Sequence, residues 1–242
     1  MTRGAKKFVY GILYLFIFGV LAYWIFGGSR TVPPHNAPSS IQDQAIPITV
    51  SGPVQIFKDG GLSRTTLLAN VTNKNADYGV KKLDYAFALY DKGGALVDQI
   101  RGFTTVFPGE SKYILGSYEG TPYNIERISR ADLSFFSPEW VLGSELIASH
   151  LAVAGKPVTT IADNGIRITG SVENSSPLTT GTVKVIAILY NKYDDPIFAG
   201  QTLLEKIRSL DSAPFSVYFP PDPVFVEKLD PSRTKVFVST GE

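Results

Sequence analysis

The chain has 242 residues, of which 44% are hydrophobic and 19% charged, so it is long enough for one large domain or two of about 100 residues each. Its 23 basic and 22 acidic residues leave a net charge of +1, which gives no indication of nucleic-acid binding. There is no cysteine, which excludes disulfides and thiolate catalysis. With only His35 and His150, a histidine-based zinc site or a Ser-His-Asp triad is disfavoured.

The N-terminal region contains a long apolar run, residues 8–26, without a charge or a proline. At 1.5 Å per residue a helix of this length spans about 28 Å, close to the thickness of a bilayer core. Three basic residues, Arg3, Lys6 and Lys7, precede the run. The positive-inside rule therefore predicts a cytoplasmic tail over residues 1–7, with everything after the helix on the outside.

The other end of this run indicates an uncleaved signal anchor. Tyr23 and Trp24 lie near the predicted outer interface, where amphipathic rings are favoured. The alternative is a secretory signal, but its apolar region is usually shorter and ends in an A-x-A-like site. Either reading exports the rest of the chain. Residues 27–45 are rich in proline and serine and predict a linker that carries the folded part away from the membrane.

Beyond the linker, short β-type segments recur with a period of about 100 residues. In the first copy, Leu67–Asn73 is followed by Leu83–Asp91. In the second, Ile168–Asn174 is followed by Val183–Asn191. The repeat predicts two β-domains, residues 46–140 and residues 141–242.

Alternating apolar residues predict the inner face of one strand in each copy. The inward positions are Leu83, Tyr85, Phe87 and Leu89 in the first copy and Val183, Val185, Ala187 and Leu189 in the second. Each copy contains six or seven such strands and no helical period. The predicted fold class is all-β, with two tandem immunoglobulin-like antiparallel β-sandwiches behind one N-terminal transmembrane helix.

One strand of the first copy contains the letters F-x-L-Y-D, formed by Phe87, Leu89, Tyr90 and Asp91, and a Pro-Gly-Glu turn follows it at residues 108–110. This resembles the FxLYD family, small immunoglobulin-like β-sandwich domains of exported or membrane-anchored prokaryotic proteins. The resemblance covers Ile46 to Trp140 and implies an architecture without catalytic residues.

The second copy departs from the FxLYD pattern. It keeps Leu189 and Tyr190, but Ala187 replaces the phenylalanine and Asn191 the aspartate. The second copy is therefore similar to the family in layout only.

Several residues are candidates for chemistry. Tyr90 and Tyr190 occupy equivalent positions on the outward side of their strands. They are either ligand contacts or residues that cover the edge of the sandwich, and we favour the second interpretation. Asp91, with Asp194 and Asp195, could bind calcium, but aspartates beside hairpin turns usually form the turn itself, and we favour that interpretation.

Two further patterns bear on a serine nucleophile and on an aromatic binding surface. Ser111 and Lys112 are adjacent on a predicted strand, so they point to opposite faces and cannot form a nucleophile–base pair. Tyr118 and Tyr123 lie in a loop-prone segment and are expected to be exposed contacts for a ligand or partner. No catalytic residue, metal site or cofactor is predicted.

These features favour a non-enzymatic binding or scaffold protein, anchored in the plasma membrane by a single helix with its C-terminal domains outside. Its expected partner is a protein of the cell envelope, reached by strand addition or loop contact. The expected role is an accessory subunit of an envelope assembly or a surface adhesion module. The alternative is a module that binds a small ligand or a cell-wall glycan, and an enzyme is the least favoured class.

Overall fold

The computed structural model describes residues 41–59, 63–146, 150–221 and 223–240. The described chain consists of antiparallel β-sheets with a few short helices, which confirms the all-β prediction. The predicted tail, the apolar run 8–26 and most of the predicted linker lie outside these residues. Among the residues that the structure does describe, none of the helices is long and apolar enough to cross a membrane.

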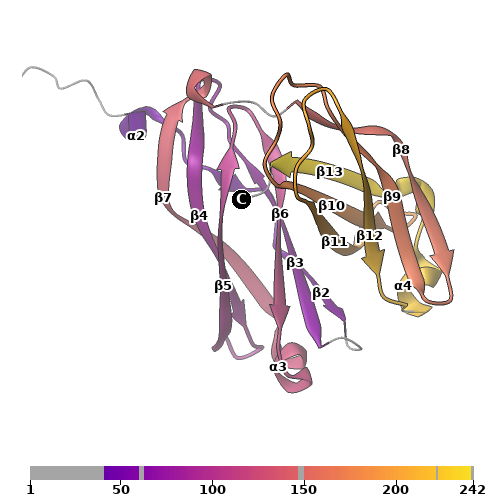
Figure 1. Cartoon of the computed structure of the whole chain (residues 1–242). Helices are drawn as coiled ribbons and strands as arrows, with labels where there is room; N and C mark the ends of the chain where they lie inside the picture. Colours follow the sequence, from indigo (N-terminus) through magenta and orange to yellow (C-terminus); the bar gives the residue numbers. More distant parts are fainter. Residues whose placement is uncertain (1–40, 60–62, 147–149, 222, 241–242) are drawn as a thin grey trace, which may run out of the picture. The chain divides into compact units, whose positions relative to one another are not determined.

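The first sandwich consists of the strands up to Leu142. These are β1 (Thr49–Val50), β2 (Gln55–Asp59), β3 (Arg64–Thr72), β4 (Tyr78–Tyr90), β5 (Leu96–Val106), β6 (Ser111–Glu119) and β7 (Arg130–Leu142). In one sheet β3 pairs with β1 and β2 on one side and with β6 on the other. In the other sheet β4 lies between β5 and β7 (Figure 1).

The core of the first sandwich follows the alternation of β4. Leu83, Phe87 and Leu89 are fully buried and pack against Leu67 and Val71 of β3. Burying each of these large side chains stabilises the fold by about 1.5–3 kcal/mol. The predicted period of two and its register are therefore confirmed for this strand.

The second sandwich begins after a short 3-10 helix, Gly143–Glu145. Its strands are β8 (Leu151–Ala162), β9 (Gly165–Asn174), β10 (Val183–Tyr190), β11 (Pro196–Leu204), β12 (Ser212–Phe219) and β13 (Lys235–Thr240). The sheets have the orders β12–β9–β8 and β11–β10–β13. The first sandwich has the same two arrangements, β6–β3–β2 and β5–β4–β7, so the pairing order repeats along the chain as the sequence repeat does.

Strand β10 is buried on both of its faces. Val183, Val185, Ala187 and Leu189 take the inner face, as predicted. The opposite side chains, Ile186 and Ile188, are also buried, and belong to one apolar cluster with Phe57, Leu68 and Leu115 of the first sandwich. Both sandwiches lie in a single compact unit, and this cluster forms the contact between them.

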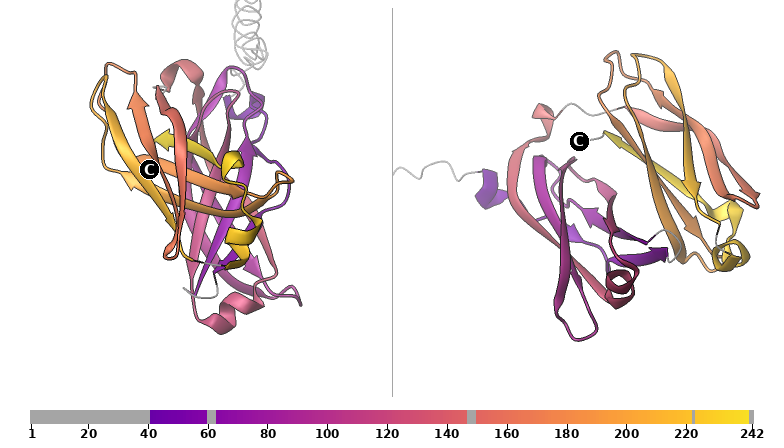
Figure 2. Two further views of the ribbon diagram at one scale, coloured as in Figure 1. Left: turned by 90° about the vertical axis from the view of Figure 1, so that its right-hand side faces the viewer. Right: turned by 60° about the horizontal axis from the view of Figure 1, so that its bottom comes forward.

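In the described residues, short α-helices lie at three points: α2 (Ile41–Gln44), α3 (Pro122–Arg127) and α4 (Pro223–Lys228). Helix α3 lies beyond the end of β6 (Figure 2). Thr121 caps it by accepting a hydrogen bond from the Asn124 N–H, and Pro122 occupies its first turn. The segment expected as a hairpin loop therefore contains a helical turn, fastened to the core by Ile125.

Candidate functional site

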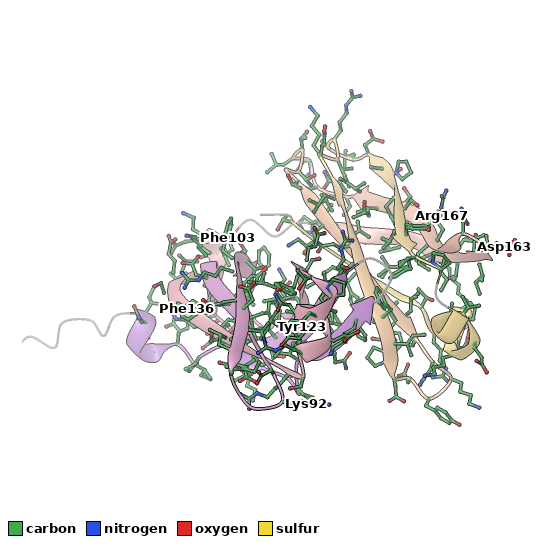
Figure 3. All side chains as sticks on the ribbon, turned by 90° about the horizontal axis from the view of Figure 1, so that it is seen from below. Lys92, Phe103, Tyr123, Phe136, Asp163 and Arg167 are labelled. Atoms are coloured by element: carbon green, nitrogen blue, oxygen red, sulfur yellow. The ribbon has the colours of Figure 1, made fainter. Side chains whose placement is uncertain are left out.

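The outer face of the β5–β4–β7 sheet carries two exposed phenylalanines. Strand register places Phe103 of β5 and Phe136 of β7 on either side of Asp84. Their exposed fractions are 43% and 42% (Figure 3). The rest of this surface alternates small and polar side chains. We name it the open face, formed around the buried Ala86 by Asp84, Ala88, Gln99, Arg101, Phe103, Asp132, Ser134 and Phe136.

Charges of both signs surround these rings. The Lys82 Nζ lies 3.2 Å from a carboxylate oxygen of Asp84 and 5.5 Å from the centre of the Phe103 ring. The Arg101 guanidinium donates two hydrogen bonds to Gln99 Oε1, at 3.0 and 3.1 Å. Because the charges are mixed and solvated, they contribute little to stability. They leave the face amphipathic and without one dominant sign.

The corresponding face of the second sandwich is covered. Ile186, Ile188 and Tyr190 stand at the positions of Ala86, Ala88 and Tyr90, and all three are buried; in the first sandwich Ala86 is buried too, whereas Ala88 and Tyr90 are half-buried. Burial raises the pKa of Tyr190 well above its usual range, helped by a hydrogen bond with Tyr113 of the first sandwich. By contrast, Tyr90 is half-buried beneath the Arg130 guanidinium, 4.7 Å from its ring centre.

The tyrosines of the two motif strands therefore share a position but differ in surroundings. Tyr190 is part of the contact between the sandwiches, whereas Tyr90 covers the end of its own sheet. In the described part of the chain, protein covers this face in the second sandwich and leaves it open in the first.

Asp91 organises the β4–β5 hairpin turn. Its Oδ1 accepts hydrogen bonds from the backbone N–H groups of Gly93 and Ala95, both at 2.9 Å. Its Oδ2 pairs with Arg127 of α3 at 2.8 Å. The hydrogen bond from Arg127, followed by the bond from Ala95, holds the pKa of Asp91 below its usual range. These contacts agree with the interpretation of Asp91 as a turn residue.

The second copy forms the same turn with a neutral side chain. Asn191 Oδ1 accepts from the N–H groups of Tyr193 and Asp195, at 2.8 and 2.9 Å. Asp194 has a positive φ of 66° and pairs with Lys235 at 3.4 Å. The aspartate-to-asparagine change therefore preserves the turn and removes the carboxylate that Arg127 contacts in the first copy.

The two tyrosines expected as ligand contacts lie in different surroundings. Tyr118 is 8% exposed, because its register opposite Thr65 directs it into the core; the expectation of an exposed ring was wrong. Tyr123 is 68% exposed on α3 (Figure 3). Together with Lys92 and Arg127 it lines a shallow cavity of about 340 Å³.

The remaining predicted residues divide into two groups. Phe87, Leu89 and Leu189 are fully buried core residues, so these motif positions serve the packing of the core. The membrane-interface residues lie outside the described chain. These are Arg3, Lys6, Lys7, Tyr23 and Trp24.

Two buried asparagines, one in each repeat, have equivalent structural roles that the sequence pattern did not predict. Asn73 Nδ2 donates to the Tyr78 and Phe107 carbonyls at 2.8 and 2.9 Å, joining the β3–β4 and β5–β6 connections. Asn174 Nδ2 donates to three carbonyls in the corresponding connections of the second sandwich, at 2.8–3.3 Å. The matched Asn at the end of each repeated strand was the available signal.

The open face was also missed, although the sequence contained a sign of it. Phe135 and Phe136 are adjacent in β7, so only one of them can point inward. Phe135 packs into the core, which leaves Phe136 on the outer face. The role of Arg127 had no such sign, because its partner Asp91 is 36 residues away.

Comparison with known proteins finds only distant similarities. No family model matches the chain, and no curated protein matches it. Red sea bream transglutaminase aligns over 82% of this chain and 32% of its own, with 10% identity and a TM-score of 0.25. Bacteroides uniformis beta-glucuronidase aligns over 68% of this chain and 23% of its own, with 14% identity and a TM-score of 0.21.

A third structure is the tandem CBM22-1-CBM22-2 domain of Paenibacillus barcinonensis Xyn10C. It aligns over 80% of this chain and 85% of its own, with 8% identity and a TM-score of 0.18. The chain thus spans about a third or less of the first two proteins. None of these similarities is close enough to support an assignment of function.

Proposed function

We propose that this chain is a membrane-anchored, extracytoplasmic, non-enzymatic scaffold whose folded part binds a protein of the cell envelope. Residues 8–26 form the anchor, supported by their length, their lack of charge and the basic residues before them. The two sandwiches are immunoglobulin-like, and the first is an FxLYD-type domain, supported by the motif strand and the repeated order of pairing. The protein acts as an accessory subunit of an envelope assembly.

The observation that carries this proposal is the open face. Two large aromatic side chains stand exposed there on a regular sheet, on either side of Asp84 of the central strand. In the second sandwich the same face is buried against protein. Exposed apolar surface that is rimmed by polar groups is typical of interaction sites. The binding partner that best fits the open face is therefore a protein surface.

Photo-crosslinking in intact cells tests this function. A photoreactive phenylalanine analogue is placed at position 103 or 136, with position 193 as a control on a well-exposed hairpin of the second sandwich. We expect one envelope protein to crosslink from positions 103 and 136 and not from 193. Equal patterns at all three positions, or none, would contradict a specific partner at the open face.

The absence of cysteine offers a direct test of topology. Single variants Thr2→Cys and Tyr193→Cys are exposed to a membrane-impermeant maleimide. We expect Tyr193→Cys to react in intact cells and Thr2→Cys only after the membrane is permeabilised. Reaction of Thr2→Cys in intact cells would refute the proposed orientation.

A second candidate function is the binding of a small ligand or glycan at Tyr123. It is favoured by the exposed ring, which stands 5.4 Å from the Arg127 guanidinium at the wall of the shallow cavity. Binding of the protein to isolated cell-wall material should then be lost in Tyr123→Ala and kept in Tyr193→Ala, which removes a similarly exposed ring. Binding that survives Tyr123→Ala would exclude this site.

A further inference from the structure

Strand β5 is an edge of its sheet, and two side-chain contacts reveal which of its backbone groups point outward. Asp98 Oδ1 accepts a hydrogen bond from the Gln99 N–H at 2.7 Å. At the other end, Lys112 of β6 donates to the Thr105 carbonyl at 2.9 Å. Both contacts use odd-numbered residues of β5. Neither backbone group is therefore directed toward the ladder with β4.

In an antiparallel strand the direction of the backbone groups alternates from residue to residue, so the outward direction at Gln99 and Thr105 also fixes it for the residues between them. Each residue directs its N–H and C=O to one side of the strand, and consecutive residues alternate. The pairing of β5 with β4 is regular from Thr104 to Asp98, with shifts only at the two ends. Arg101 and Phe103 consequently direct both backbone groups away from β4. Within the described chain these groups have no partner.

Three of the other described edge strands carry devices that oppose strand addition; β6, the outer strand of the β3 sheet, carries none of them. Proline lies within β7, β8 and β12, at Pro138, Pro157 and Pro214. Strand β8 also contains a bulge between Ala154 and Val158. Such features protect natural edges from pairing. Strand β5 contains no proline, and its register has no shift from residue 98 to residue 104.

The second sandwich again provides an internal comparison. Its equivalent edge strand, β11, carries Phe198 and Ala199, which are buried. Phe198 stacks on Phe57 of β2 with ring centres 5.7 Å apart, so β11 packs against the first sandwich. At β5, by contrast, the side chains of Arg101 and Phe103 are exposed.

We propose that the β5 edge binds an extended segment of a partner protein, which adds to the β5–β4–β7 sheet as an antiparallel strand. The segment pairs with Arg101 and Phe103 and carries an apolar residue followed, two positions later, by an acidic one. The apolar side chain lies opposite Phe103 and the carboxylate opposite Arg101. Main-chain hydrogen bonds then provide affinity and alternate side chains provide selectivity. This inference rests on the proposed function and names the kind of partner.

A synthetic peptide tests the proposal on the full-length protein in detergent. The probe is fluorescein-labelled Thr-Thr-Val-Thr-Glu-Thr-Thr with an amidated C-terminus, measured by fluorescence anisotropy. We expect saturable binding, weakened about threefold when glutamine replaces the glutamate, the range of an exposed ion pair. Absence of binding up to millimolar peptide would overturn the proposal.

Two variants of one residue separate backbone from side-chain recognition. Arg101→Pro removes an outward N–H that no strand in the described chain uses, a substitution that edge strands tolerate. We expect it to weaken binding by about tenfold or more. Arg101→Ala keeps the N–H, so it should abolish only the preference for glutamate over glutamine. Unchanged binding by Arg101→Pro would refute strand addition at this edge.

N-methylated peptides test strand addition without altering the protein. Methyl groups on the N–H groups of the valine and the glutamate, which face β5, should abolish binding. Methyl groups on the second, fourth and sixth residues, threonines whose N–H groups face away from β5, should not. If both peptides bind equally, the edge is not the site.

Three further outcomes distinguish the occupant of the edge from the proposed function. If the purified protein dimerises in sedimentation velocity and Arg101→Pro makes it monomeric, a second copy occupies the edge and the partner segment is refuted. If crosslinks form at the open face but no peptide binds, the edge proposal fails while the scaffold function stands. If the peptide binds but no envelope protein crosslinks, the scaffold function fails instead.

Discussion

Asn73 offers the sharpest test of how the first sandwich is held together. It is 1% exposed, and its side chain makes four hydrogen bonds. Its Nδ2 donates to the Tyr78 and Phe107 carbonyls, and its Oδ1 accepts from the backbone and side-chain N–H groups of Asn75. At about 1 kcal/mol of net stabilisation for each bond, Asn73→Ala should lower the free energy of unfolding by about 4 kcal/mol. That is a large share of the stability of a typical domain.

Urea unfolding followed by tryptophan fluorescence measures this loss. Trp140 packs against the first core, and a Trp24→Phe background leaves it as the single reporter. Lys74→Ala, an exposed change at the next residue, is the matched control and should alter stability by less than about 0.5 kcal/mol. A loss below about 1 kcal/mol in Asn73→Ala would show that these hydrogen bonds do not fasten the connections as we argue.

Two further predictions concern packing and pH. A Cβ at Gly116 would lie 2.9 Å from Cδ2 of the buried Phe87 ring. Gly116→Ala should therefore lower the free energy of unfolding of the first sandwich by about 1–3 kcal/mol, measured in urea. The control is Gly181→Ala, which has open space around it and should cause no such loss. Because burial raises the pKa of Tyr190, the folded state keeps this hydroxyl protonated at a pH where the unfolded chain, with a tyrosine pKa of 10.0, ionises. The free energy of unfolding should therefore fall as the pH rises above that value, and it should fall less steeply in Tyr190→Phe. Equal slopes between pH 9 and 11 would contradict this assignment.

The alternation of one strand was sufficient to predict its orientation. In β4, Leu83 and Phe87 alternate with Asp84 and Ala86, so only one face is apolar enough to fill a core. A half-buried strand has one stable register under that constraint, because a slip of one residue would expose the whole apolar set. The repeat of about 100 residues was visible for the same reason, since both copies preserve the strand pattern.

Side chains whose partners lie far away in sequence could not be assigned this way. Tyr118 belongs to a strand whose inner face is set by its register with β3, and the sequence around it does not contain that register. The ion pair between Asp91 and Arg127 and the bonds of Asn73 to Phe107 likewise join segments separated by more than 30 residues. Such contacts depend on how the sheets are stacked.

The sequence by itself determined the all-β class, the inward register of the motif strand and the chemical character of the apolar run at residues 8–26. Only the tertiary structure decided which outer faces are covered. In β10 both faces are apolar, and the choice of the face that meets the other sandwich depends on Phe57, Leu68 and Leu115, more than 60 residues earlier. The open face and the free edge of β5 follow from the same cause. Exposure is a property of neighbours brought together by folding, and a strand's own residues do not specify those neighbours.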